Sequence, residues 1–320
     1  MLRLLANVLL LLALTPLALA QSYPTKPIRM IVPFPPGGPT DIVGRLVAGE
    51  MEKRIGQPVV VENRPGAGGT VGSSAAASAP ADGYTLLYGS TSTLAIAPSL
   101  YRKLAYDPRT AFAPVSLVSR GPIVIAVNAE VPARTLKEFI DLAKRTPGKL
   151  SYGSAGNGTP PHLAGELFKV VAGVDLLHVP YKGGAPAIND LAGGVVQAIF
   201  EGQVALIPHL KSGRVRALAI TGDERNPALP DVPTAAQAGL PQYNAHFWSG
   251  LVAPAGTPAE AVSRLNSALV QALSTQQMRD TLMRYGLEPA GNSPQQFAAY
   301  IRAEIERWAG VVKASGAKVD

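Results

Sequence analysis

The sequence contains no cysteine, and this absence excludes several kinds of protein at once. Without a thiol there is no disulfide framework, no thiolate nucleophile and no cysteine that a lipid could modify after an export signal. The sequence also lacks a run of lysine and arginine residues, although its net charge is +7. Nucleic-acid binders gather such charges into a stripe with interleaved aromatic residues, so we expect a basic, soluble surface that binds no nucleic acid.

Motifs of nucleotide-binding and hydrolytic sites are missing as well. No segment matches the phosphate-binding pattern G-x-x-x-x-G-K-[ST]. The segments GAGGTVG (66–72) and GSAGNGTP (153–160) fail the dinucleotide pattern G-x-G-x-x-G, because Val71 and Pro161 stand where the third glycine belongs. The hydrolase motif G-x-S-x-G is also absent. We therefore expect no enzyme, no cofactor and no nucleotide ligand.

Metal ligation has little support in the sequence. His162 and Glu166 lie four residues apart, on one face of an expected helix, but no third ligand stands near them. The other histidines, His178, His209 and His246, fall in or near expected strands and helix ends, where structural roles are commoner. We expect no metal site.

The first twenty residues, MLRLLANVLLLLALTPLALA, have the features of an export signal. Arg3 supplies the positive start, an apolar run follows, and Ala18-Leu19-Ala20 forms a small-x-small cleavage site. An uncleaved anchor is the alternative, but the run is short for a membrane span and Pro16 interrupts its end. We expect cleavage after Ala20 and a soluble protein in a bacterial periplasm.

In the remaining chain, short β-rich segments alternate with helical patterns, which predicts an α/β fold with mostly parallel sheets flanked by helices. The length suggests about two domains. The capping box Thr135-Leu136-Lys137-Glu138 begins one helix and Pro147-Gly148 ends it. Two amphipathic helices, with no strand between them, are expected near the C-terminus and should pack on one sheet. The expected strands are residues 28–34, 58–64, 85–90, 122–128, 150–155, 176–181, 195–201 and 215–221.

Glycine, serine and threonine concentrate at the ends of these strands, where ligands of parallel α/β sheets gather. After the first strand, Gly38 should be the N-cap of a helix with Pro39 as its first residue. The free amides of such a helix start bind anions. Asp41 would repel an anion if it faced the pocket, so we expect it to accept hydrogen bonds from loop amides instead.

The loop 154–159 carries a different constraint. If Thr159 caps the next helix, Pro160 and Pro161 remove two amides from its first turn. An anion must then be met by Ser154, Asn157, Gly158 and Thr159, which favours a carboxylate over a phosphate.

Segments along nearly the whole mature chain resemble, in order, the motifs of the Bug family, the periplasmic solute receptors of tripartite tricarboxylate transporters. The resemblance implies a two-lobed, flytrap-like type II periplasmic binding protein. Lobe one would comprise residues 22–121 and 223–320, and lobe two residues 122–222. The matching segments are VPFPPGGPTDIVGRLVA, GQPVVVENRPGAGGTVG, ADGYTLLYGSTS, YGSAGNGTPPHLAGELF, HVPYKGGAPAINDLAGG, LPDVPTAAQAGLP and FWSGLVAPAGTP.

The resemblance also implies a small organic carboxylate as ligand, membrane subunits of a transporter as partners, and a monomer. Two alternatives are a receptor for a signalling system and an exported enzyme acting on carboxylated substrates. Glu201 stands where the family commonly has an aspartate. If Glu201 faces the cleft, it would favour a ligand that carries an amine or amide. If it forms a salt bridge at the hinge, the ligand specificity remains unconstrained. The implied ligand-binding residues are Phe34, Gly38, Thr40, Asp41, Ser90, Thr91, Ser92, Ser154, Asn157, Thr159, His162, Tyr181, Gly183 and Glu201.

Overall fold

The computed structural model describes residues 23–222 and 224–319. The expected export signal lies outside these residues. Within them, no helix combines the length and the apolar character that crossing a membrane requires.

The first sheet is built around β1 (Ile28–Val32), which pairs in parallel with β2 (Val59–Asn63) on one side and β3 (Thr85–Ser90) on the other. Three of the expected strands are thereby confirmed. Helix α2 (Pro39–Ile55) connects β1 to β2, and η1 (Ala67–Gly69) and α3 (Thr70–Ala77) connect β2 to β3. A π-helical turn, η2 (Ser92–Ile96), and α4 (Ala97–Leu100) follow β3.

The second sheet repeats this parallel arrangement. Its β5 (Ser151–Ser154) lies between β6 (Leu177–Pro180) and β7 (Ala198–Gly202). The helices of this part are α5 (Leu136–Arg145), α6 (Pro160–Ala172), α7 (Gly184–Ala192) and α8 (Gln203–Lys211). Helix α5 begins with the expected capping box: Thr135 Oγ1 accepts from the Glu138 amide, and the Glu138 carboxylate accepts from the Thr135 amide.

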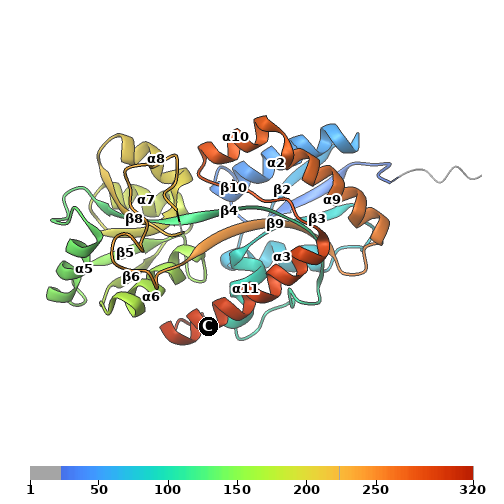
Figure 1. Ribbon diagram of the computed structural model, residues 1–320. Coiled ribbons are helices and arrows are strands. Elements are labelled where there is room, and N and C mark those ends of the chain that lie inside the picture. The colour runs from blue at the N-terminus through green and yellow to red at the C-terminus, as the bar shows by residue number, and fades with distance from the viewer. Residues whose placement is uncertain (1–22, 223, 320) are drawn as a thin grey trace, which may run out of the picture.

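A single long strand, β4 (Phe112–Asn128), belongs to both sheets. Residues 112–122 pair antiparallel with β9 (His246–Pro254), and residues 123–128 pair antiparallel with β7 and with β8 (Val215–Ile220). Figure 1 shows β4 running between two groups of helices, which gives the chain the two-lobed α/β fold that the sequence predicted. The sequence pattern predicted the second half of β4, whereas its first half and β9 were not predicted.

The C-terminal segment contains the two expected helices, α9 (Ala259–Ser274) and α11 (Pro294–Ser315). They cover opposite faces of the first sheet, because Leu265 and Leu269 of α9 pack in one core cluster and Phe297 and Ile305 of α11 pack in the other. The expectation of no strand between them was wrong: α10 (Gln276–Arg284) and β10 (Glu288–Pro289) intervene. A two-residue strand carries no detectable periodicity, and β10 exists only through its pairing with β4.

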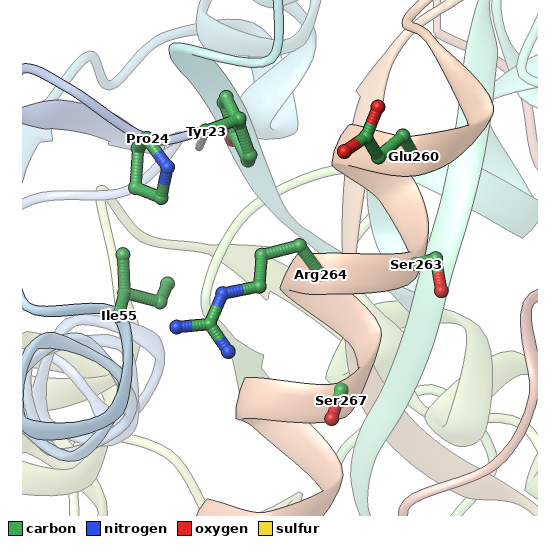
Figure 2. A pocket seen from close by; sticks show the side chains of 7 residues that line it. All are labelled: Tyr23, Pro24, Ile55, Glu260, Ser263, Arg264 and Ser267. Atoms are coloured by element: carbon green, nitrogen blue, oxygen red, sulfur yellow. The ribbon is translucent and has the colours of Figure 1, made fainter. Parts of the chain in front are cut away.

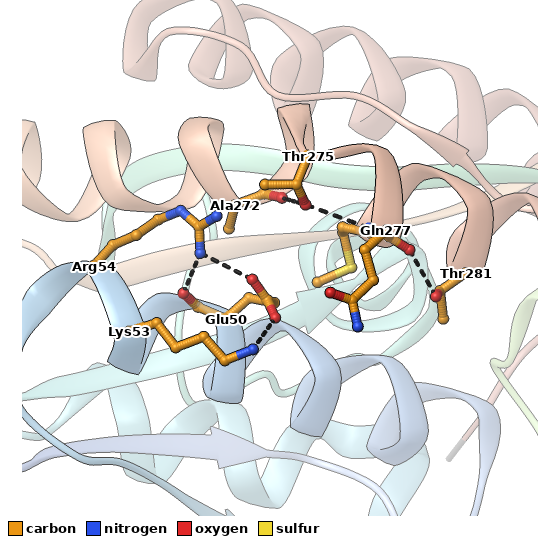
Figure 3. A network of polar contacts seen from close by, with 8 residues as sticks. Glu50, Lys53, Arg54, Ala272, Thr275, Gln277 and Thr281 are labelled. Carbon is orange, nitrogen blue, oxygen red and sulfur yellow. Dashed lines mark hydrogen bonds and ion pairs between the residues drawn. The ribbon is translucent and has the colours of Figure 1, made fainter.

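The end of α2 is fixed beside the junction of α9 and α10 (Figure 3). Glu50 accepts from Lys53 and Arg54 of its own helix, at 2.5 and 2.9 Å. Thr275 caps α10 through its hydroxyl oxygen. These contacts stabilise the last turn of α2 and the first turn of α10, and the strand ends described below lie at the opposite end of α2.

Candidate functional site

Three loops of the first lobe meet at one edge of its sheet, because β1, β2 and β3 are parallel and end on the same side. Gly69, with φ +95°, brings the loop after β2 against the other two. A Cβ atom added at Gly69 would lie 2.7 Å from Thr93 Cγ2 and 3.1 Å from Phe34 Cζ. Residues 66–69 were not among the predicted site residues, although they form a glycine run after a strand, as the neighbouring loops do.

The loop after β1 has the expected helix start, with Gly38 as N-cap, Pro39 in the first position and Asp41 in the first turn. Asp41 is buried, and its Oδ2 accepts from the Gly37 amide at 2.9 Å and from Arg45 Nε at 3.0 Å. Asn63 Nδ2 donates to Oδ1 at 2.8 Å. Burial pushes the pKa of the Asp41 carboxyl upward, but these three hydrogen bonds together hold it below its usual range. Asp41 thus binds its own loop, as expected.

The residues after β3 differ in how their hydroxyls are used. Thr91 is fully buried, and its hydroxyl exchanges hydrogen bonds with the backbone of Trp248 on β9. Ser90 is also buried, yet its Oγ has no hydrogen-bond partner among the described residues. Because an unpaired buried hydroxyl is costly, Ser90 Oγ is a donor that a ligand could satisfy. Ser92 is buried beside them, and Thr40 is half-buried in the first turn of α2.

The second lobe brings together residues 154–159, 181–184 and 201, since β6 and β7 both run parallel to β5. Asn157 is exposed, while Ser154 and Thr159 are buried. Thr159 is the N-cap residue of α6, as predicted, but its hydroxyl makes no capping bond. It donates to the Gly156 carbonyl at 2.7 Å instead. The two prolines remove the amides of the first two helix positions, so only the His162 amide remains in the first turn as a possible donor to this hydroxyl.

His162 lies beneath this loop, not on its surface. Its side chain is buried, and its Nδ1 accepts from the Gly158 amide at 3.1 Å. Glu166, which the sequence offered together with His162 as a possible metal ligand, accepts from Tyr152 Oη at 2.7 Å and forms an ion pair with Lys169. Among residues 23–222 and 224–319, no cluster of three or more potential metal ligands occurs.

Glu201 ends its strand beside the start of α7. Its Oε1 accepts from the Gly202 amide at 2.9 Å, and a Cβ atom added at Gly184 would lie 3.2 Å from Oε2. In the described part of the chain Glu201 forms no ion pair, so the hinge salt bridge is not observed. Burial raises the pKa of the Glu201 carboxyl to about 7. Gly183, with φ +127°, is the N-cap of α7, and Tyr181 Oη donates to Asp190 at 2.6 Å.

The loops of the two lobes touch one another. A Cβ atom added at Gly158 would overlap Leu100 of the first lobe, and one added at Gly68 would lie 3.4 Å from the Asn157 carbonyl oxygen. Tyr101 Oη lies between them and donates to the Ala67 carbonyl at 2.9 Å. Leu100 and Tyr101, which the sequence analysis also missed, therefore belong to the contact between the lobes.

A separate cavity of about 480 Å³ lies between the end of α2 and α9 (Figure 2). Its lining includes Ile55, the last residue of α2, and Arg264, whose guanidinium donates to the Arg54 carbonyl at 3.0 Å. Helix α2 has 17 residues, so its two ends stand about 25 Å apart. This cavity is thus remote from the strand-end loops and does not belong to the candidate site.

Two lobes that share a long strand and meet through Gly-rich loops have the architecture of a solute-binding protein. Residues 43–317 match the family model described as "Tripartite tricarboxylate transporter family receptor". The chain belongs to this family of receptors, which confirms the resemblance and the prediction that the protein is not an enzyme.

Individual relatives agree with this assignment. BugT of Bordetella pertussis is 41% identical over 301 residues, which cover 94% of this chain and 92% of BugT. The structure described as R. palustris Rpa4515 with adipate has a TM-score of 0.89 and 38% identity, covering 93% of this chain and all of that one. MatC of Rhodopseudomonas palustris with bound malate has a TM-score of 0.85 and 38% identity, covering 91% of this chain and all of that one.

Proposed function

We propose that this protein binds a small organic carboxylate between its lobes in the periplasm and delivers it to the membrane subunits of a tripartite transporter. The observation that carries the proposal is the meeting of Gly-rich strand-end loops from both lobes at Gly68 and Gly158. Structures of relatives with adipate and with bound malate support a carboxylate as ligand, and a relative described as a periplasmic transporter supports the compartment. We further propose that the mature protein begins after Ala20 and acts as a monomer.

The lobes in this proposal consist of residues 22–121 with 223–320, and of residues 122–222. The pairing of β4 supports this division, since Pro122 pairs with His246 of β9 and Ile123 pairs with Gly202 of β7. Because a ligand can shift the equilibrium between open and closed forms only by binding the closed form better, contacts with both lobes are required.

The ligand contacts in this proposal come from two sets of neutral donors. In lobe one, the Ser90 hydroxyl and the free amides of the α2 start are available. In lobe two, the exposed Asn157 and the amides at the start of α7 are the proposed donors, and Gly184 of that helix start lies beside Glu201. Phe34 forms an apolar wall against Gly69. Thr91, His162 and Tyr181 act through the groups that they hold, since the hydroxyls of Thr91 and Tyr181 and the Nδ1 atom of His162 are bonded within the protein.

Thermal denaturation with a panel of ligands tests the proposal. At a concentration 100 times the Kd, one-site binding adds about 2.7 kcal/mol of stability, so at least one mono- or dicarboxylate should raise the Tm by several degrees. A panel in which only nucleotides or neutral sugars stabilise the protein would contradict it. Ser90→Ala should then weaken the strongest carboxylate by about 1 to 3 kcal/mol, whereas Ser274→Ala, on the outer side of α9, should bind it unchanged.

A receptor for a signalling system is the second candidate, because the same ligand contacts would serve it. The two candidates differ in the partner that recognises the closed form. Ligand-dependent binding to the purified membrane subunits of the transporter favours transport, and its absence favours signalling.

A further inference from the structure

Two histidine side chains are stacked directly under the loop 154–159. His162 of α6 and His178 of β6 have ring centroids 4.2 Å apart and an interplanar angle of 22°. The His178 ring also stacks on Tyr152 of β5, at 4.9 Å. His162 is 5% exposed and His178 is half-buried, so the pair lies at the edge of the interior of lobe two.

Each histidine holds a different end of the loop. His178 Nε2 and Ser154 Oγ are 2.7 Å apart, at the first residue of the loop. The Gly158 amide donates to His162 Nδ1 at 3.1 Å, near the last residue. Between these points, the Gly156 amide donates to Ser154 Oγ and the Thr159 hydroxyl donates to the Gly156 carbonyl. The imidazoles thus fix the two ends, and the loop's own hydrogen bonds fix the middle.

The loop needs such support because of its sequence. Gly156 and Gly158 have φ values of +123° and +78°, which glycine adopts at a high cost in conformational entropy. Pro160 and Pro161 occupy the first two positions of α6, so the helix contributes no amide there to hold the loop or a ligand. The donors that this loop offers to a ligand are the amides and hydroxyls of residues 154–159, and their directions depend on the loop's shape.

The hydrogen bond from Gly158 defines the state of the His162 ring. Its Nδ1 must be unprotonated to accept, so the ring is neutral and carries its proton on Nε2. The groups that face the pair from the packed elements are Glu166 and Lys169 of α6 and Tyr152 of β5. Glu166 is bonded to Tyr152 and Lys169. These three residues are thus paired with one another, and the imidazole nitrogens bond to Gly158 and Ser154 instead.

We propose that His162 and His178 are positioning residues, which hold the loop 154–159 in the shape that presents its hydroxyl and amide groups to the ligand. This inference rests on the proposed function, and it assigns to His162 a role other than the ligand contact that the sequence predicted. The neutral pair acts through Ser154 and Gly158, and neither ring touches the ligand.

Asparagine and glutamine substitutions test the proposal, because the amide of asparagine occupies the place of Nδ1 and that of glutamine the place of Nε2. Positioning requires Nδ1 at residue 162 and Nε2 at residue 178. His162→Asn and His178→Gln should therefore bind the best carboxylate of the panel within about threefold of wild type, and His162→Gln and His178→Asn should weaken it tenfold or more. Isothermal titration calorimetry gives these Kd values, and the Tm of each variant shows that it folds.

If the two histidines act through packing alone, the affinities of the four variants should rank differently. Glutamine fills more of the space than asparagine, so it would be the better substitute at both positions, and that result would overturn the proposal. Amide hydrogen exchange of Gly158 in the ligand-free proteins gives an independent readout. His162→Asn should keep the protection of this amide and His162→Gln should lose it. If wild type bound no carboxylate at all, the proposed function would fail, whereas equal exchange in both variants would refute the positioning role itself.

Discussion

The loop 33–41 in lobe one and the loop 154–159 in lobe two occupy equivalent places, each between a parallel strand and a helix that begins with proline. They are held by opposite chemistry. Asp41, as an ion, gathers an amide, an arginine and an asparagine in lobe one. In lobe two, the neutral imidazoles of His162 and His178 hold the loop through Gly158 and Ser154.

This difference separates the two loops by pH. The pKa of the Asp41 carboxyl lies below its usual range. The carboxylate therefore stays charged, and holds the loop of lobe one, at every pH between about 5 and 8. Burial lowers the pKa of His162, and burial together with the nearby His162 lowers the pKa of His178 to about 3. These imidazoles stay neutral in the folded protein at a cost that grows as the solution becomes acidic. One half of the site is therefore sensitive to acid and the other half is not.

The largest effect should come from removing the charged anchor. Asp41→Asn retains one acceptor oxygen but replaces the other by an NH2 group, which cannot accept from Gly37, Arg45 or Asn63 and is itself buried without an acceptor. We expect the free energy of unfolding to fall by about 3 kcal/mol, measured by urea denaturation at pH 7.

Asp141→Asn is the matched control. Asp141 also pairs with a cation four residues away, Lys137, at 2.6 Å, but both side chains are largely exposed. The control should leave the urea midpoint unchanged, since exposed ion pairs contribute little. Equal losses of unfolding free energy in the two variants would mean that the Asp41 ion pair contributes no more than an exposed surface pair, and that Asp41 does not anchor the loop of lobe one.

Lowering the pH should reduce the free energy of unfolding by an amount that depends on His178. The folded pKa is below the unfolded value of 6.5, so the stability that this group contributes is present above pH 6.5 and is lost as pH falls toward 3. Between pH 6.5 and 5 the loss should be about 1.5 kcal/mol. Urea denaturation of wild type and His178→Gln at both pH values measures it as the difference in their pH dependence. Parallel pH profiles for the two proteins would contradict the assignment.

The sequence predicted these two loops unequally well. For lobe one, the N-cap Gly38, Pro39 and the role of Asp41 follow from local helix-start rules, and all three are observed. For lobe two, the anchoring bonds join residues distant in the chain: Ser154 bonds His178, 24 residues away. No local rule connects two such residues, so the sequence did not predict these anchoring bonds.

The fold shows the same distinction between local and distant information. Strands with alternating helices were predicted close to their observed bounds, because each carries its own apolar pattern. β9 was missed, since its residues follow a long irregular segment and its place between β3 and β4 is fixed only by tertiary pairing. Tyr101 and Leu100 were missed because their importance arises only when the lobes meet.

Glu201 adds a second pH effect to lobe two, of opposite sign. Its folded pKa of about 7 exceeds the usual value of 4.5, so the group takes up a proton on folding, and its charge becomes unfavourable as pH rises through 7. A ligand carboxylate beside it would raise this pKa further. We therefore expect the affinity for a dicarboxylate to weaken by up to tenfold per pH unit between pH 7 and 8.

Titration calorimetry at pH 6, 7 and 8 measures this effect, with Glu201→Gln as the comparison. The variant cannot ionise, so its affinity should change little with pH. If the affinity of wild type instead strengthens as pH rises, the ligand places an amine or amide near Glu201. If wild type and variant have the same pH dependence, Glu201 does not face the ligand.

The smallest effect separates a helix cap from a loop contact within lobe two. Thr135 Oγ1 accepts from the Glu138 amide and belongs to a complete capping box, whereas the Thr159 hydroxyl bonds only its own loop, at the Gly156 carbonyl. Thr135→Val should therefore lower the free energy of unfolding by about 1 kcal/mol and leave the Kd unchanged, because α5 starts far from the strand ends. Thr159→Val should cost about as much stability, through the lost bond to Gly156. Since that bond shapes the loop under the ligand, only Thr159→Val should also raise the Kd, by about threefold to tenfold, and an unchanged Kd would mean that the histidine pair alone determines the shape of the loop.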